Sequence, residues 1–383
     1  MFFITLSLIL PTMVRQNGYS NWLEINCTTL KQNLNRIRQL TNTNVMAVVK
    51  ANGYGHGIVE VARVAAESDV AYCGIARVEE GLELRSAGIR VPLLVLGYTP
   101  PYRFDRAIEA DISITLFEPE QIPQLLEAAR RVGKKGKVHV KVETGMGRLG
   151  AAPETALSIL HQLHNNPDVL VEGLFTHYAR ADELEEPATD SQQQVFMRLL
   201  EEVAEAGLRP PIVHTANSAA SLIRPSTHFD MVRAGIALYG LSPSPEVLLP
   251  TGIEPGLTWK AQLCEVRTLP PGTGISYGHI YTTTGFERIG VVPVGYGDGY
   301  RRVSGNSVLV RGAKAPIVGR VCMDQMMVQL DSVPDAVVGD EVILIGRQGS
   351  ESITADMLAA HWGTINYEVI CGLSARVPRI YLE

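Results

Sequence analysis

The feature that most constrains the fold of this chain is an alternation of buried strands with helices between residues 22 and 250. The strand candidates are apolar, β-branched runs that are too continuous for half-exposed strands, so both of their faces must be covered. Helical stretches lie between them, for example residues 58–67, 118–132, 153–164 and 191–206. Eight strands with intervening helices match a closed (β/α)8 barrel, although a doubly wound sheet gives the same local pattern. The strand candidates are residues 45–50, 71–76, 92–97, 112–116, 138–143, 170–177, 212–215 and 231–236.

The character of the sequence changes between Leu241 and Gly256, where prolines and glycines accumulate. This composition is typical of a connector between domains. Beyond it, short runs bounded by Gly and Pro predict strands, with one helical stretch at residues 354–362. We therefore predict an α/β chain in which an N-terminal (β/α)8 TIM-like barrel at residues 22–250 precedes a C-terminal mainly-β domain at residues 251–383. Residues 1–21 are expected to be an N-terminal extension outside the core.

Several classes of function are disfavoured by composition. The net charge of -6 and the lack of a basic stripe argue against nucleic acid as a partner. Five scattered cysteines without a C-x-x-C pair suggest reduced thiols and a cytoplasmic protein. No H-E-x-x-H motif or Cys/His cluster predicts a metal site. The apolar run at residues 2–10 is too short for a membrane span, and a cleaved signal is one alternative. We favour a start site upstream of the globular protein, which would begin near Met13 or later, and we expect no membrane partner.

The first predicted strand ends on Lys50, within residues 48–57, VVKANGYGHG. A lysine at the end of a buried strand must be paired, covalently consumed or shifted toward its neutral form. Three glycines in the loop allow positive φ, and the helix after it offers its N-terminus to an anion. A lysine that extends to solvent is the simpler interpretation of Lys50 alone. The more specific interpretation of Lys50 is a Schiff-base lysine beside a phosphate-holding loop, as pyridoxal phosphate (PLP) requires.

Other polar residues follow the predicted strands. Arg148, His177, Ser218 and Arg233 all lie at carboxyl ends, which meet on one rim of a barrel. Each has a simpler interpretation as a surface arginine, a core histidine or a helix cap. Arg233 is the exception, because a guanidinium in an apolar strand needs acceptor partners.

Residues 48–57 and further motifs resemble the alanine racemases, PLP-dependent enzymes of fold type III. The resemblance covers nearly the whole chain after Trp22. Its other motifs are residues 141–150 (KVETGMGRLG), 175–179 (FTHYA), 216–218 (ANS), 232–236 (VRAGI), 275–278 (ISYG), 294–299 (VGYGDG), 321–324 (VCMD) and 365–368 (INYE).

The resemblance implies two catalytic residues. Lys50 would hold PLP and act as the base on one face of the substrate Cα, and Tyr277 of a second subunit would act on the opposite face. Racemisation needs a proton site on each face, because a single base tends to return the proton to where it came from. His177, Arg233 and Asp324 are implied as supporting residues.

The binding residues also follow from the resemblance. Arg233 would donate to the pyridine nitrogen of PLP, and Arg148 with the N–H of Met323 would bind the substrate carboxylate. Lys141 would be carbamylated and would orient Arg148; the alternative is an ion pair between Lys141 and Glu143. The remaining cofactor-binding residues, mainly around the phosphate, would be Tyr54, Asn217, Ser218, Gly235, Ile236 and Tyr367.

The sequence thus predicts a homodimeric, PLP-dependent racemase that interconverts L- and D-alanine, shares its active sites between subunits and supplies D-alanine for peptidoglycan. One alternative is a racemase for serine or for several amino acids. A second is a non-catalytic PLP-binding protein with the same barrel, against which Tyr277 and Asp324 argue. A third is a decarboxylase of related fold, which usually has a functional cysteine in its β domain.

Overall fold

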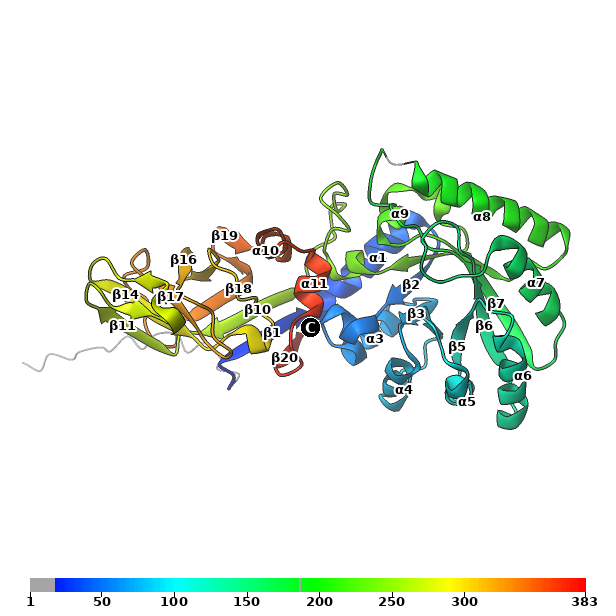
Figure 1. Cartoon of the computed structure of the whole chain (residues 1–383), viewed down its shortest axis with the longest axis horizontal. Helices are drawn as coiled ribbons and strands as arrows, with labels where there is room; N and C mark the ends of the chain where they lie inside the picture. The colour runs from blue at the N-terminus through cyan, green and yellow to red at the C-terminus, as the bar shows by residue number, and fades with distance from the viewer. Residues whose placement is uncertain (1–17, 186) are drawn as a thin grey trace, which may run out of the picture. The chain divides into compact units, whose positions relative to one another are not determined.

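The computed structural model describes residues 18–185 and 187–383 (Figure 1). The apolar run at residues 2–10 lies outside these residues. The chain forms two compact units. The barrel unit contains Glu24–Leu257, Ala355–Leu373 and Tyr381–Glu383, and the β unit contains Thr258–Thr354, Ser374–Ile380 and the described residues up to Leu23. The chain therefore crosses between the units more than once, and neither is one contiguous stretch.

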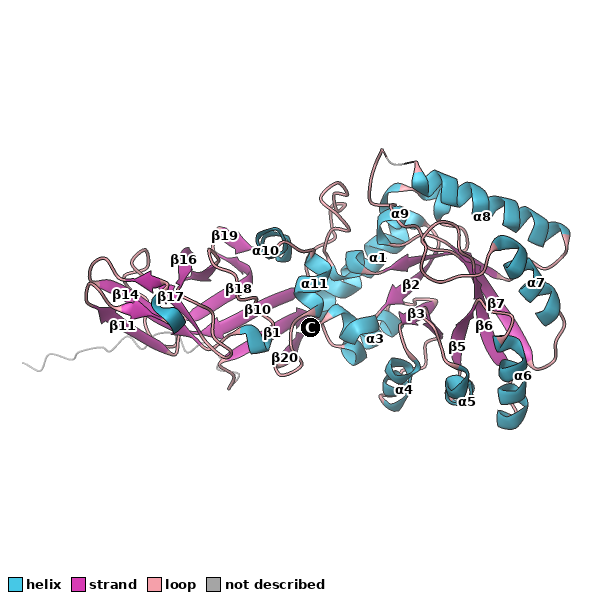
Figure 2. Cartoon of the chain, viewed as in Figure 1, coloured by secondary structure: helices cyan, strands magenta, loops and turns pink. Residues whose placement is uncertain are grey.

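The barrel unit is built on eight parallel strands in the order β8-β7-β6-β5-β4-β3-β2-β9 (Figure 2). The two ends of this order meet, because Asp230 donates its N–H to the Val213 carbonyl and Arg233 donates to the Ala216 carbonyl, each at 3.0 Å. The predicted (β/α)8 barrel is confirmed. Its strands are β2 (Asn44–Val48), β3 (Tyr72–Ile75), β4 (Leu93–Val95), β5 (Ile112–Leu116), β6 (Gly136–Lys141), β7 (Val169–Phe175), β8 (Ile212–His214) and β9 (Met231–Ala234).

Helices cover the outside of the barrel because each buries one apolar stripe. In α3, for example, Ile58, Val61, Ala62 and Ala65 are buried, a spacing that follows the helical repeat. The helices of this unit are α1 (Cys27–Thr41), α2 (Lys50–Tyr54), α3 (Ile58–Glu67), α4 (Val78–Ser86), α5 (Phe104–Glu109), α6 (Gln121–Val132), α7 (Pro153–Leu163), α8 (Ala188–Glu205), α9 (Ser218–Ile223), α10 (Ala355–Trp362) and α11 (Asn366–Cys371). Short 3-10 turns are η1 (Pro101–Arg103), η2 (Pro225–Thr227) and η3 (Ile236–Tyr239).

Several strands end earlier than the sequence predicts. β2 ends at Val48, so Lys50 begins the turn after the strand instead of ending the strand itself. β7 ends at Phe175, two residues before His177. The apolar pattern continues past the last ladder hydrogen bond because residues at the barrel rim are still buried, and sequence alone cannot separate burial from strand pairing.

The β unit consists mainly of antiparallel strands, ordered β11-β14-β17-β16-β15-β18-β10-β1-β20, with β19 beside β18 and a separate β12-β13 pair. Ile275, Ile289 and Val318 form one of its buried clusters. The strands are β1 (Asn21–Asn26), β10 (Leu257–Gln262), β11 (Glu265–Leu269), β12 (Gly274–Ile275), β13 (Tyr281–Thr282), β14 (Glu287–Val292), β15 (Ser307–Val310), β16 (Ala313–Val318), β17 (Met326–Gln329), β18 (Glu341–Gln348), β19 (Glu351–Ile353) and β20 (Arg379–Leu382), with 3-10 turns η4 (Tyr277–His279) and η5 (Tyr296–Asp298). Among the described residues, no helix has the length and apolar character needed to cross a membrane.

Candidate active site

Lys50 begins a turn with unusual backbone geometry. Ala51, Asn52, Gly53 and Tyr54 have φ angles of 54°, 55°, 59° and 50°, in the left-handed region. This conformation costs about 1–2 kcal/mol for each residue that has a Cβ. The sequence predicted positive φ only for the glycines, so the left-handed Ala51, Asn52 and Tyr54 are a finding of the structure. A strained turn of this kind persists only where surrounding contacts hold it.

Two side chains hold the turn. Oε1 of Glu80 accepts the N–H of Ala51 at 2.8 Å, and Oε2 of the same carboxylate accepts the N–H of Ala76 at 2.7 Å. Oδ1 of Asn52 accepts the N–H of Ile58 at 3.0 Å. The first N–H of α3 is therefore occupied from within the chain, and the expectation that this helix offers its N-terminus to an anion stays a prediction for the N–H groups that follow Ile58.

The electrostatic surroundings of Lys50 favour its neutral amine. Burial is the main cause that lowers the pKa of Lys50, and the Arg148 cation is the next. Arg233 acts in the same direction, whereas Cys371 and Glu80 oppose it. A lysine with a lowered pKa has a larger neutral fraction near pH 7, and only the neutral amine attacks a carbonyl.

Hydroxyl and backbone N–H groups converge where α9 begins. Oγ of Ser218 accepts the N–H groups of Gly235, at 2.8 Å, and Ala237, at 3.3 Å. A Cβ added to Gly235 would lie 2.9 Å from the Tyr54 hydroxyl, so this glycine keeps room for the cluster. The ring of Tyr367 lies 6.2 Å from that of Tyr54. Several hydroxyl and amide donors around one point match the donor set that a phosphate needs.

The helix cap differs from the one that the sequence suggested. Asn217, not Ser218, is the N-cap of α9, because its Oδ1 accepts the N–H of Ala220 at 3.0 Å. Ser218 is the first helical residue, and its hydroxyl is therefore free of the cap and bonds to the N–H of Gly235.

Arg233 is the most extensively bonded cation of the barrel. Its side chain is buried and donates to the carbonyls of Thr176, His214 and Thr215 at 2.8–3.0 Å. It also donates to Nδ1 of His177 at 3.1 Å and Nδ1 of His214 at 3.0 Å. Burial lowers the pKa of Arg233 to about 10. None of these partners is a carboxylate, so the buried charge is stabilised by dipoles alone and is suited to meet an acceptor from a ligand.

Lys141 is buried beside the other cations. Burial, followed by Arg148 and Arg233, lowers its pKa to about 8. Its ammonium lies 5.5 Å from the centre of the Phe175 ring. Glu143 instead accepts backbone N–H groups of the loop after β6, including those of Met146 at 2.6 Å and Arg148 at 3.2 Å. Among the described residues Lys141 and Glu143 form no ion pair, which disfavours that alternative.

The residues of the barrel unit fit PLP. Lys50 supplies an amine with a lowered pKa, the Tyr54 and Ser218 hydroxyls with the Gly235 N–H supply a phosphate-type donor cluster, and Arg233 supplies a buried donor without an anionic partner. These are the three functional groups that an aldehyde, a phosphate and a ring nitrogen require.

The predicted residues of the β unit also share one location. Tyr277 and Met323 line one pocket with Asp324, and they are 68% and 54% exposed. The Asp324 carboxylate pairs with Arg376 at 2.8 Å, and Arg376 pairs in turn with the buried Asp298 at 2.8 Å. Motifs almost 50 residues apart are thus brought together on one surface.

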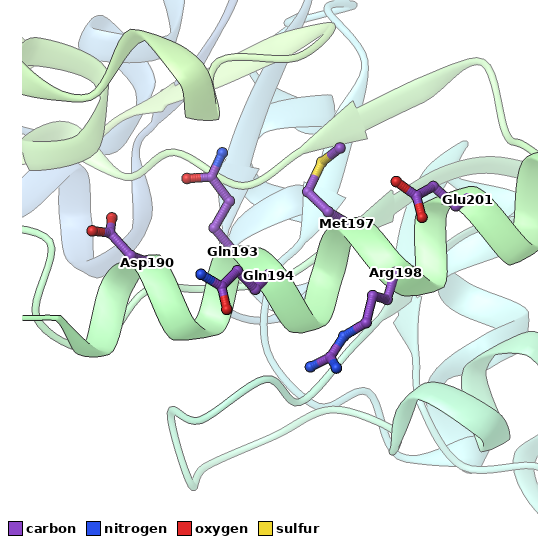
Figure 3. Close-up of a pocket in the computed structure, with 6 residues that line it drawn as sticks. All are labelled: Asp190, Gln193, Gln194, Met197, Arg198 and Glu201. Atoms are coloured by element: carbon purple, nitrogen blue, oxygen red, sulfur yellow. The ribbon is translucent and has the colours of Figure 1, made fainter.

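Sequence reasoning missed some polar residues of the barrel. His214 accepts from Arg233, and Glu80 holds the Lys50 turn. A histidine inside the apolar run at residues 212–215 was the available signal for His214. A further pocket, which contains none of the predicted residues, lies along one helix, α8 (Figure 3), and is lined by Asp190, Gln193, Gln194, Met197, Arg198 and Glu201.

Comparison with known proteins places this geometry in context. The model of the alanine racemase N-terminal domain matches residues 25–243, and that of the C-terminal domain matches residues 256–381. An alanine racemase of Symbiobacterium thermophilum is 46% identical over 94% of this chain and 96% of its own length. One of Geobacillus stearothermophilus is 44% identical over 94% of this chain and 93% of its own.

Solved structures of alanine racemases also superpose on this chain. The alanine racemase of Clostridium difficile 630 superposes with a TM-score of 0.90 at 42% identity, covering 95% of this chain and 96% of that one. The enzyme of Bacillus anthracis, solved with bound L-Ala-P, gives a TM-score of 0.90 at 40% identity and covers 95% of each chain.

Proposed function

The chain belongs to the alanine racemase family and is an isomerase that interconverts L- and D-alanine, and we propose that it does so with PLP bound covalently to Lys50. The observation that carries the proposal is the position of Lys50: a half-buried lysine with a lowered pKa at the start of a left-handed turn, in the same unit as the Tyr54, Ser218 and Gly235 cluster.

The barrel residues divide the binding of the cofactor between them. The Lys50 amine would hold the aldehyde. Tyr54, Ser218, Tyr367 and the N–H groups of Gly235 and Ile236 would hold the phosphate, with Asn217 keeping the start of α9 in place. Arg233 would donate to the pyridine nitrogen. When bound, PLP withdraws electrons from the amino acid and makes its Cα–H acidic.

The chain's own groups would then move the proton. The Lys50 amine and the Tyr277 hydroxyl would each accept or return a proton at Cα, from opposite faces. Arg148 and the N–H of Met323 would bind the carboxylate of alanine, and Lys141, carbamylated on Nζ, would orient Arg148. His177 lies against Arg233, and burial together with the Arg233 charge lowers the pKa of His177 well below its usual value.

We also propose a homodimer with shared active sites. Tyr277 and Met323 are exposed in the β unit although both are proposed to act on the substrate, which supports their use by a partner subunit. Asp324, held by Arg376, would support this surface. The five free cysteines are in keeping with a reducing cytoplasm, and supply of D-alanine to peptidoglycan would be the role of the product.

Reduction with borohydride tests the cofactor proposal. The PLP-loaded protein is reduced and digested, and the peptide that carries the pyridoxyl group is sequenced by mass spectrometry. The expected label is on Lys50, with none in Lys50→Ala. A label on another lysine, or no label, would contradict the proposal.

A second experiment tests the substrate. Single enantiomers of alanine, serine and lysine are incubated with the loaded protein, and loss of optical rotation is followed. Alanine is expected to lose rotation fastest. Faster loss with serine would favour the broad-specificity alternative.

A further inference from the structure

A line of polar side chains crosses the barrel interior from Arg233 to Glu172. Nη1 of Arg233 lies 3.0 Å from Nδ1 of His214, and Nε2 of His214 lies 3.0 Å from Nδ1 of His139. Nε2 of His139 lies 3.8 Å from Oε2 of Glu172. The four residues come from β9, β8, β6 and β7, and both histidines are completely buried. Nothing in the proposed proton transfer uses His139 or Glu172.

Only one arrangement of protons along this line suits both the arginine at one end and the carboxylate at the other. Guanidinium has donors only, so Nδ1 of His214 must accept and its proton must be on Nε2. That N–H donates to Nδ1 of His139, which places the proton of His139 on Nε2 as well. The line therefore ends on an N–H directed at the Glu172 carboxylate, a group that accepts only.

Both histidines remain neutral in this environment. Burial, with a smaller effect of the Arg233 charge, lowers the pKa of His139 to about 3, and the same causes lower that of His214 well below its usual value. Their state is thus a choice between two tautomers rather than a choice of charge.

Glu172 is held in place from two sides. Its Oε2 accepts the Ser113 hydroxyl at 2.5 Å and the Tyr72 hydroxyl at 3.2 Å, and its side chain is 13% exposed. Burial and the neighbouring carboxylate raise the pKa of Tyr72, which keeps this phenol protonated as a donor. Among the described residues, Nε2 of His139 has no hydrogen-bond partner at normal distance, so the Glu172 carboxylate is the acceptor that it faces.

Gly173 makes room for this arrangement. A Cβ at residue 173 would lie 2.1 Å from Nδ1 of His139 and 2.6 Å from its Cε1. The pairing of β6 with β7 also shifts register between Val138 and His139. The φ angle of Gly173 is not positive, so the glycine is required by space and not by backbone conformation. Any side chain there would displace the His139 ring.

We propose that Glu172 and His139 are positioning residues, which hold His214 in the tautomer that accepts from Arg233 and so fix the direction in which the guanidinium presents its remaining N–H, the one on Nε. The proposal rests on the proposed function, because that donor matters for the pyridine nitrogen of PLP. With His214 in its other tautomer, an N–H would oppose the guanidinium N–H groups, and Arg233 would have to move.

Nitrogen NMR of the full chain tests the proposal directly. Protein labelled with ¹⁵N-histidine is measured before and after loading with PLP, because ring-nitrogen shifts distinguish a protonated nitrogen from a bare one. In the wild-type protein we expect Nε2–H for His139 and His214 in both forms. In Glu172→Leu we expect mixed tautomers at both residues, an altered absorption spectrum of bound PLP and a severalfold rise in pyruvate formed per racemisation.

Two control pairs separate positioning from general damage to the core. Gly173→Ala displaces the His139 ring without removing a polar group and should reproduce the changes of Glu172→Leu. Gly136→Ala, on the neighbouring strand, directs its Cβ at the flexible Leu125 side chain and should leave the tautomers unchanged. Glu287→Leu is matched to Glu172→Leu, since Glu287 is a buried carboxylate of the β unit that accepts from Tyr281 at 2.5 Å.

The outcomes discriminate between the two proposals. Nδ1–H at His214 in the wild-type protein, or unchanged tautomers and an unchanged spectrum in both Glu172→Leu and Gly173→Ala, would overturn the positioning role. The tautomers are measured before PLP is added. The predicted tautomers can therefore be contradicted while the borohydride label still appears on Lys50. Expected tautomers without a label on Lys50 would remove the cofactor proposal, and the functional part of the positioning role with it.

Discussion

The guanidinium of Arg233 lies 3.1 Å from Nδ1 of His177, although the two residues are 56 positions apart in the sequence. Since arginine only donates, Nδ1 of His177 must be the acceptor of this bond. Neutral His177 then has its proton on Nε2. One buried cation therefore contacts two histidines, His177 and His214, and each must present a bare Nδ1 to it.

Replacing Arg233 by glutamate should change the course of the reaction. A guanidinium gives no proton to the pyridine nitrogen, which keeps the cofactor a weak electron sink, whereas a carboxylic acid would supply one. Arg233→Glu is expected to lower racemisation and to raise the conversion of alanine to pyruvate. The measurement is pyruvate released per racemisation event; an unchanged ratio would contradict this role of Arg233.

Mixing two inactive variants tests the shared site. Lys50→Ala and Tyr277→Phe should each lose about 10²–10⁴-fold in racemisation, because each removes one proton site. When equal amounts are dissociated and reassociated, half of the dimers are mixed, and each mixed dimer has one intact site of two. Activity should return to about a quarter of wild type. No recovery, with mixed dimers verified by mass, would mean that each chain completes its own site.

Substitution of Arg148 should alter how Lys50 responds to pH. The pKa of Lys50 is lowered by burial first and by the Arg148 cation second, so removing that cation leaves the burial effect and raises the pKa part of the way back. At a given pH Arg148→Leu then has less neutral amine. The pH at which the cofactor-free protein captures PLP at half its maximal rate should shift upward, measured by stopped-flow absorbance. A downward shift of this pH would show that the Arg148 cation does not lower the pKa of Lys50.

Lys141 is expected to carry a carbamate. Its pKa of about 8 leaves part of the amine neutral near pH 7.5, and the neutral Nζ adds to the carbon of CO2 with release of one proton. Protein equilibrated with ¹³C-bicarbonate should show a carbamate signal by ¹³C NMR that Lys141→Gln lacks. Glu143→Gln serves as a control, since Glu143 forms no ion pair with Lys141 in the described part of the chain. A signal that persists in Lys141→Gln would place the modification elsewhere.

The same lysine predicts a dependence of stability on pH. In the folded chain without CO2 the pKa of Lys141 is about 8, against 10.5 for an unperturbed lysine, so between these values the unfolded chain binds more protons. Stability attributable to this group therefore rises as pH increases from about 8 to 10.5. Chemical denaturation should show that Lys141→Met is more stable than wild type below pH 8 and that this advantage disappears at higher pH.

Gly235 should be sensitive to a single added methyl group. A Cβ there would lie 2.9 Å from the Tyr54 hydroxyl and 3.5 Å from Oγ of Ser218. Gly235→Ala is expected to displace these hydroxyls and to weaken PLP binding about tenfold, a loss of roughly 1.4 kcal/mol. Equilibrium dialysis measures the Kd. Gly285→Ala is a control for added side-chain bulk, because nothing lies within 4 Å of a Cβ at that position and its φ is not positive.

Local patterns in the sequence determined the architecture of this protein. Eight continuous apolar runs separated by helical periodicity predicted the eight-stranded barrel, because burial on both faces leaves a signature that needs no knowledge of long-range contacts. The motifs around Lys50, Arg148, His177 and Arg233 predicted which residues matter, since residues at the carboxyl ends of barrel strands share one rim.

Only the tertiary structure decided which side chains meet. The left-handed Ala51 and Asn52 depend on Glu80, a residue from a different element, and Glu143 bonds to backbone amides instead of to Lys141. His139 and His214 are 75 residues apart, yet their rings are joined at 3.0 Å. Periodicity states which face of a strand a residue occupies, but the partner across the barrel is set by strand register and by the space that Gly173 leaves, and neither is encoded locally.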